Sequence, residues 1–319
     1  MVRRTIFLFL VLIIVSLFTF WVFVKLPAGD PIARAVGKHP SPELVAQVRE
    51  KFGLDRPLYV QYWKFASGMI PWPGLFLDED VYFSYQSQTP VKDAILDRLP
   101  VTLALTLGAA VLWVAIGVPI GIISAIKPGT LIDRSAMIFA LIGVSAPTFW
   151  LGLVLLYVFH FWLGWLPTAG LPQDQSVLQS VFEGYFVLPW FSLAITSAAF
   201  YSRMTRGNLM ETMSEDYIRT ARSKGISERR VIYRHGLRAA LTPIVTMFGL
   251  DVAFLLGGAI ITESVFQLPG LGQYALISLY QADFPAVMAV TLISTFFIIV
   301  ANFLIDITYA FLDPRVRYT

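Results

Sequence analysis

LPVTLALTLGAAVLWVAIGVPIGIISAI, residues 99–126, is a run without a charged side chain. A helix needs about 20 apolar residues to cross a hydrocarbon core about 30 Å thick. The run is longer than that, which is typical of a single tilted helix that spans a membrane. Its apolar residues are continuous rather than alternating with polar ones, and this pattern disfavours a β-barrel.

Five further stretches pass the same test, one of them with a single charge, Asp251. They are residues 5–24, 135–166, 184–202, 239–262 and 284–305. The sequence therefore predicts an all-α polytopic membrane protein with six transmembrane helices. A cleaved signal peptide is the alternative for the first stretch, but that stretch is longer than a typical h-region and no clear A-x-A site follows it.

Composition supports a membrane protein and disfavours an enzyme. The chain is 56% hydrophobic and 14% charged, whereas a soluble domain averages about 25% charged residues. There is no cysteine, which excludes disulfides and thiolate chemistry. No G-x-x-x-x-G-K-[ST] motif and no Ser/His/Asp or metal-ligand constellation is present. We expect no cofactor, no metal and no nucleic-acid partner, and any energy source must lie in another subunit.

The distribution of basic residues predicts the orientation. Lys and Arg occur in residues 1–4, 127–134, 203–238 and 306–319, whereas the short loops 167–183 and 263–283 contain neither. The stretch 25–98 has nine basic and nine acidic residues, but it is long enough to be translocated whatever its charge. Basic loops stay in the cytoplasm, so both chain ends are predicted to be cytoplasmic. The expected organisation is a first transmembrane helix (1–27), an extracytoplasmic segment (28–98), a five-helix core (99–312) and a cytoplasmic tail (313–319).

The predicted extracytoplasmic segment has its own local signals. Ser41 and Pro42 are typical of a helix start, which predicts a short helix over Glu43–Phe52 closed by Gly53. An aromatic cluster follows between Tyr59 and Phe65. Two interpretations stay open: a small cap on the membrane surface, with aromatic rings at headgroup level, or a landing site for an extracytoplasmic partner.

The basic segment 203–238 carries helix-capping signals. Ser214 is expected to cap a helix from about Glu215 to Lys224, with acids at its start and cations near its end. Gly225 stands where a C-cap glycine belongs, and Ser227 is expected to cap a second helix. The pattern predicts two helices joined by a glycine bend.

Positive charge alone would make this segment a topology signal and a contact for lipid headgroups. The spacing of Ala221 and Gly225 indicates more, because four residues apart they would present a small-residue surface at a helix end. Such a surface would let the backbone of another protein approach closely.

Ala221-x-x-x-Gly225, with Leu241-x-Pro243 downstream, resembles the EAA motif of binding-protein-dependent ABC importer permeases. The surrounding Asp216–Gly225 is similar to the branch that carries dipeptides, oligopeptides and nickel. The chain departs from the motif's name, since it reads Arg219-Thr220-Ala221 where EAA would stand; the peptide branch commonly varies there.

Further matches extend the resemblance over nearly the whole chain, to the first of the two paired peptide permeases. They are Leu26–Pro31, Gly53–Leu58, Arg98-Leu99-Pro100-x-Thr102, Pro269-Gly270-Leu271-Gly272 after Glu263–Phe266, and Asp313–Arg317.

The resemblance implies a permease subunit in a prokaryotic cell (inner) membrane, forming half of a translocation pathway for short peptides. The implied partners are a homologous second permease, two ABC ATPase subunits that bind ATP and Mg, and an extracytoplasmic substrate-binding protein. The residues implied in ATPase coupling are Asp216, Tyr217, Arg219, Ala221, Arg222, Lys224 and Gly225.

Import of nickel or another small solute is the alternative within this class. An ion-coupled carrier would predict inverted repeats, which the sequence does not display, and a membrane scaffold would predict a dry bundle interior.

Asp251 is the charge within the predicted fifth span. A carboxylate in hydrocarbon costs about 2.5–3.5 kcal/mol on insertion scales, so we expect it to face the bundle interior or a water-filled path. Two roles stay open: a hydrogen bond that holds two helices together, or attraction of a cationic substrate group such as a peptide amino terminus. Glu263 is either part of an outer gate or an ordinary interfacial acid. Pathway or gate roles are also expected for Pro269, Gly270 and Gly272.

Overall fold

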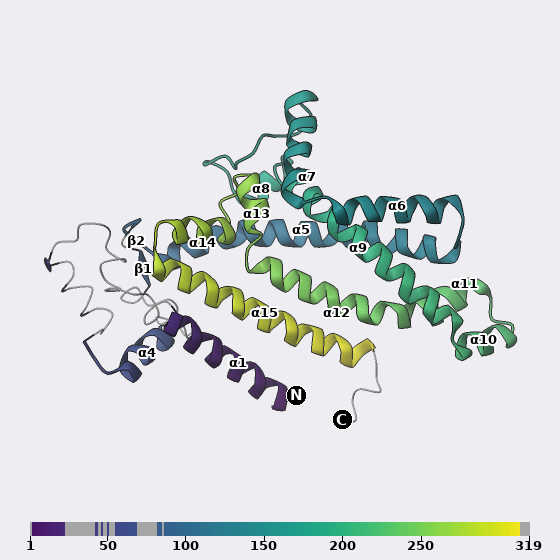
Figure 1. Cartoon of the computed structure of the whole chain (residues 1–319), viewed down its shortest axis with the longest axis horizontal. Helices are drawn as coiled ribbons and strands as arrows, with labels where there is room; N and C mark the ends of the chain where they lie inside the picture. The colour runs from purple at the N-terminus through teal and green to yellow at the C-terminus, as the bar shows by residue number, and fades with distance from the viewer. Residues whose placement is uncertain are drawn as a thin grey trace. The chain divides into compact units, whose positions relative to one another are not determined.

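The structure is a computed structural model that describes residues 2–22, 42, 43, 46, 50, 55–68, 82–84 and 86–312. The helix expected over Glu43–Phe52 falls almost entirely outside these residues, as does the tail 313–319. Over the described residues the chain is mostly helical (Figure 1).

The elements follow one another in chain order. They are α1 (Val2–Phe20), α4 (Leu58–Ser67), β1 (Phe83–Ser84), β2 (Thr89–Pro90), α5 (Val91–Ile126), α6 (Leu131–Ser145), α7 (Thr148–Leu155), η2 (Leu156–Trp162), α8 (Val177–Phe182), α9 (Val187–Ser214), α10 (Asp216–Ser223), α11 (Glu228–Arg230), η3 (Val231–Gly236), α12 (Leu237–Leu256), α13 (Ile260–Val265), α14 (Leu271–Tyr280) and α15 (Phe284–Leu312). The chain divides into two compact units, the first comprising Met1–Thr102, Leu256–Ile260 and Pro269–Ile299, and the second the remainder.

Aromatic packing around α4 forms much of the core of the first unit. Phe65 is buried against Phe20 of α1 and against Tyr82, whose hydroxyl donates to the Phe65 carbonyl at 3.1 Å. By contrast, Tyr59 and Trp63 are 74% and 70% exposed. The predicted aromatic cluster is therefore split by helical periodicity into a buried face and an exposed face.

A buried polar pair ties the β-hairpin to the start of α15, also within the first unit. Phe83 pairs with Pro90 in the antiparallel hairpin. The Ser84 hydroxyl donates to Asp283 Oδ2 at 2.5 Å, and both residues are at most 3% exposed. Burial raises the pKa of the Asp283 carboxyl, and the bonds from Ser84 and from the Ala286 amide partly offset this.

Close helix contacts in the second unit depend on glycine. A Cβ on Gly117 of α5 would lie 2.7 Å from the Ala198 carbonyl oxygen of α9, and one on Gly143 of α6 would lie 2.8 Å from the Ala199 Cβ. Small residues allow such approach between helices in lipid. Around these contacts Trp113 and Tyr201 are fully buried.

The long run 135–166 does not form the single helix that its length predicts. It breaks at Pro147 into α6 and the α7–η2 pair, which meet at 101°; Figure 1 shows α7 turning away from the line of α6. The residue before a proline is pushed out of the helical region, and Ala146 is indeed extended (φ −82°, ψ 124°).

The fifth predicted span, 239–262, also breaks. Helix α12 ends at Leu256 and α13 begins at Ile260. Between them Gly258 has φ +114°, and a Cβ there would lie 2.5 Å from the Gly272 Cα. Only glycine combines this left-handed conformation with so close a backbone contact.

Three helical stretches in the described part of the chain are long and apolar enough to span a membrane: Val91–Ile126, Glu228–Leu256 and Phe284–Ile305. A fourth is added if the bent pair Leu131–Ser145 and Thr148–Trp162 counts as one span. These helices support an integral membrane protein. The count of six and the orientation stay predictions.

Candidate functional site

The candidate site is the segment that connects α9 to α12. Helix α9 continues past the predicted span to Ser214, and the chain turns at Glu215, which is extended, before α10 begins. The predicted cap by Ser214 is wrong: its hydroxyl donates to the Glu211 carbonyl at 2.7 Å, within α9. The helix does not stop earlier because residues 203–213 are mostly good helix formers.

The predicted C-cap at Gly225 is confirmed. Its φ is +75°, its amide donates to the Arg222 carbonyl at 3.0 Å, and the Ile226 amide donates to the Ala221 carbonyl at 3.4 Å. This pair of bonds is a Schellman motif, in which a glycine with positive φ closes the helix. No atom lies within 4 Å of a Cβ built on Gly225, so backbone conformation rather than packing requires glycine here.

A small apolar cluster holds α10 against η3. Ile218 and Val231 are fully buried, Ala221 is 6% exposed, and Met213 and Ile226 pack beside them. The expectation that Ala221 presents a small surface to another protein is wrong, because its side chain faces this internal cluster. Its small size instead allows α10 to lie close to the following turn.

A two-bond salt bridge closes the same turn from outside. Arg222 Nε donates to Glu228 Oε2 at 3.1 Å, and Nη2 donates to Oε1 at 2.7 Å. These bonds raise the pKa of the Arg222 guanidinium. Both side chains stay substantially exposed, at 42% and 56%. Bidentate geometry of this kind adds directional specificity to an otherwise weak surface pair.

The remaining implied coupling residues form the outer surface of α10 and its end. Asp216, Arg219, Lys224 and Gly225 are exposed, and Tyr217 is 46% exposed. Asp216 and Arg219 approach each other at 3.4 Å on this surface. The segment thus has a buried apolar side and a polar outer side that carries one accessible aromatic ring, Tyr217; Figure 1 shows where α10 and α11 follow α9.

Sequence reasoning missed a buried ion pair on α9, the helix that precedes this segment. Asp133, at the start of α6, is 3% exposed and accepts two bonds from Arg206 of α9, at 2.6 and 2.9 Å. It also accepts bonds from the Ser124 hydroxyl and the Gly129 amide. The available signal was an aspartate in a tight turn between two apolar runs, since a buried carboxylate requires a partner.

Among the expected pathway residues, Asp251 acquires a defined partner. The Tyr201 hydroxyl of α9 donates to Asp251 Oδ2 at 2.6 Å. Tyr201 is fully buried, whereas Asp251 keeps partial exposure. The bond agrees with the helix-joining role, and the residue as a whole is partly exposed.

The other expected pathway residues differ in setting. Glu263 is fully buried in the second unit, and its role, in an outer gate or as an interfacial acid, stays a prediction. In the first unit, Gly270 precedes α14 and its carbonyl accepts from the Tyr274 amide, and Gly272 lies against the broken stretch at Gly258. Pro269 belongs to the first unit too. Among the described residues, no group of three or more His, Cys, Asp or Glu side chains could hold a metal ion.

Two family models match the chain. Residues 117–318 match the binding-protein-dependent transport system inner membrane component, and residues 1–106 match the N-terminal part of such membrane components. The matches together include α10, Asp251 and the α13–α14 region.

Curated relatives extend the similarity to full length. The chain is 38% identical over 319 residues to the oligopeptide transport system permease protein AppB of Bacillus subtilis (strain 168), covering 99% of this chain and 98% of that protein. It is also 38% identical over 317 residues to the glutathione transport system permease protein GsiC of Escherichia coli (strain K12), with 99% and 98% covered.

A solved structure shares the fold. An inward-facing conformation of the MetNI methionine ABC transporter matches with a TM-score of 0.55 at 21% identity, over 70% of this chain and 98% of that chain. At this identity the likeness concerns the fold alone.

Proposed function

Because the chain belongs to the family of binding-protein-dependent transport system inner membrane components and is a permease subunit of an importer, we propose that its α10–α11 segment is the contact through which ATPase subunits act on it. The observation that carries this proposal is the construction of the segment. The Schellman turn at Gly225, the internal cluster around Ala221 and the Arg222–Glu228 salt bridge make it a small rigid body.

Rigidity matters because a force applied to α10 must reach the membrane helices. The segment follows α9 after the single extended residue Glu215, and it leads through η3 into α12 without a loop. A displacement of α10 by a partner would therefore reach both helices. The proposed partners are two ABC ATPase subunits, a homologous second permease and an extracytoplasmic binding protein, with both ends of this chain in the cytoplasm of a prokaryotic cell.

We propose short peptides as the substrate. The support is that the relatives identical at 38% over their length are named for oligopeptides and for glutathione, itself a short peptide. Asp251 is the residue best suited to a cationic amino terminus, because it is partly exposed and is the only acidic residue in α12.

Gly225→Val tests the coupling role. A β-branched residue at φ +75° costs at least about 1–2 kcal/mol locally, while the open space around Gly225 excludes a clash within the chain. We expect membrane insertion to be retained, and copurification with the ATPase subunits and ATP-driven uptake to fall at least tenfold.

Gly164→Val is the matched control. Gly164 also has positive φ (+63°) with no atom within 4 Å of a built Cβ, but it lies after η2 rather than beside α10. If copurification and uptake fell equally in both variants, backbone strain alone would cause the defect, whichever glycine was replaced. That result would overturn the proposal.

A further inference from the structure

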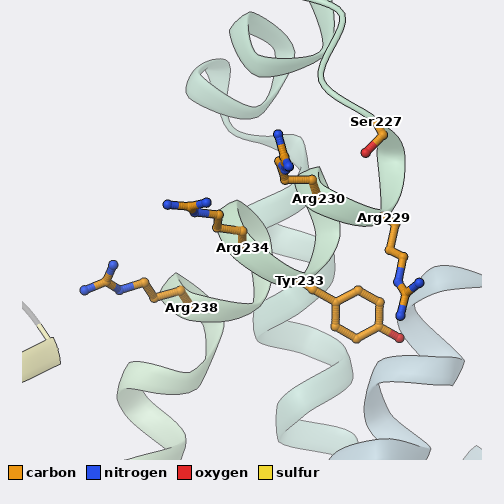
Figure 2. Close-up of a pocket in the computed structure, with 6 residues that line it drawn as sticks. All are labelled: Ser227, Arg229, Arg230, Tyr233, Arg234 and Arg238. Atoms are coloured by element: carbon orange, nitrogen blue, oxygen red, sulfur yellow. The ribbon is translucent and has the colours of Figure 1, made fainter.

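A row of arginines lies on the helix that leads into α12. Arg230, Arg234 and Arg238 are spaced four residues apart, and Figure 2 shows them extending to the same side of the helix. Residues 231–236 form a π-helix, whose wider turn of more than four residues keeps this spacing nearly in line. Tyr233 and Arg229 extend away from the row (Figure 2).

The positive charge of the row is not neutralised within the part of the chain that the structure describes. The neighbouring acids are already engaged, since Glu228 bonds to Arg222 and Asp216 approaches Arg219. No ion pair joins Arg230, Arg234 or Arg238 to an acid among the described residues. All three side chains are exposed. An anion from outside the chain would therefore meet several unpaired guanidinium groups.

The shape and chemistry of this surface suit a phosphate. The three arginines, together with Ser227, Arg229 and Tyr233, line an open hollow of about 570 Å³. A guanidinium presents a planar set of donors that matches two phosphate oxygens at once. The Ser227 hydroxyl supplies one further donor of the kind that phosphates accept.

The position on the helix identifies the source of the phosphate. Arg230, Arg234 and Arg238 occupy the first turns of the stretch Glu228–Leu256, which is apolar and long enough to span a membrane. Val231 and Ile232 are buried against the rest of the chain, and the arginines lie outside. Tyr233 is 53% exposed, as is usual for an aromatic residue at headgroup level. Where a spanning helix leaves the hydrocarbon, lipid phosphates are the most abundant anions.

We propose that Arg230, Arg234 and Arg238 bind the phosphates of anionic phospholipids next to the start of α12. Because α10 precedes this row and α11 ends with its first arginine, bound lipid would hold the segment at a fixed height at the membrane surface. This role goes beyond ATPase contact, and it does not require that contact to exist.

The test uses the full chain in nanodiscs of phosphatidylcholine with phosphatidylglycerol. The variant is Arg230→Gln/Arg234→Gln/Arg238→Gln, and native mass spectrometry measures phosphatidylglycerol retained per chain and its apparent affinity. Each arginine removed should weaken binding about fivefold. The affinity of the unmodified chain should fall as salt is raised, and Arg→Lys replacements should restore only part of it.

Lys127→Gln/Arg134→Gln/Arg203→Gln is the matched control, since it removes three exposed cations elsewhere in the same unit. Its lipid retention should stay within twofold of the unmodified chain. If the triple arginine variant fails to insert, the three single variants and the salt titration provide the same comparison.

Several results would overturn the proposal. If the test and control variants lost equal amounts of bound phosphatidylglycerol, net charge alone would determine lipid binding. Displacement of phosphatidylglycerol by inorganic phosphate at similar concentration would identify a site for a soluble anion. Lost copurification of ATPase subunits with unchanged lipid retention would assign the row to a protein contact. The lipid readout needs neither transport nor ATPase, so its failure is distinguishable from failure of the proposed function.

Discussion

The hydroxyl of Tyr201 donates a hydrogen bond of 2.6 Å to Asp251 Oδ2 and so joins α9 to α12. Both helices flank the α10–α11 segment in the chain. The bond therefore connects, within the second unit, the two helices that a movement of α10 would displace. It also supplies a partner for a carboxylate that would otherwise stand alone on an apolar helix.

Two substitutions separate the structural role of Asp251 from a role in the pathway. Tyr201→Phe removes the donor and keeps the carboxylate, whereas Asp251→Asn keeps a hydrogen-bonding group and removes the charge. If the charge attracts a peptide amino terminus, Asp251→Asn should lower uptake of peptides with a free amino terminus about tenfold and spare amino-acetylated ones. Tyr201→Phe should lower stability by about 1–2 kcal/mol without changing this preference. Uptake by reconstituted importer checks both, and identical substrate profiles for the two variants would contradict the pathway role.

The buried pair of Asp133 and Arg206 should be among the most sensitive positions in the second unit. Arg206→Ala leaves a carboxylate buried without its cation, which costs about 3–5 kcal/mol in comparable sites. Thermal unfolding of the purified chain should show a clear fall in Tm. Arg203→Ala, an exposed arginine one turn away on α9, should change stability by at most about 0.5 kcal/mol. Similar Tm values for the two variants would show that the ion pair contributes little.

The buried carboxyl of Asp283 should make stability depend on pH. Its pKa is raised in the folded state by burial, so the folded chain holds this proton more tightly than the unfolded chain does. The tighter proton binding adds to the free energy of unfolding. This contribution is fully present below about pH 4, the ordinary pKa of Asp, and is lost as pH rises through the folded-state pKa. Asp283→Asn should flatten this part of the stability profile.

Denaturation curves at several pH values measure this effect. Asp97→Asn, an exposed acid on α5, is the control and should leave the slope unchanged. A slope that survives in Asp283→Asn would assign the pH dependence to other groups.

Local signals in the sequence were sufficient for several features. Long apolar runs predict helices because a helix satisfies its backbone polar groups internally, and α5 and α15 follow that expectation. The glycine cap at Gly225 is also local, since positive φ excludes most other residues there whatever the surroundings. The resemblance around Ala221 and Gly225 identified the family, and the full-length relatives confirm it.

Tertiary structure decided where the helices break and which side chains are accessible. A proline can either bend a membrane helix or be accommodated within a continuous one, depending on whether neighbouring groups satisfy the freed backbone groups. At Pro147 the result is a bend of 101°. Ala221 faces inward because it packs with the buried side chains of Ile218 and Val231. Its spacing to Gly225 in the sequence is equally consistent with an exposed surface. The partners Arg206 for Asp133 and Tyr201 for Asp251 lie 73 and 50 residues away in sequence. Sequence by itself therefore determined the membrane character, the glycine cap at the end of α10 and the family of this chain, because these depend on neighbouring residues. The charge pairs and the accessible face of the segment depend on long-range packing, which only the folded chain supplies.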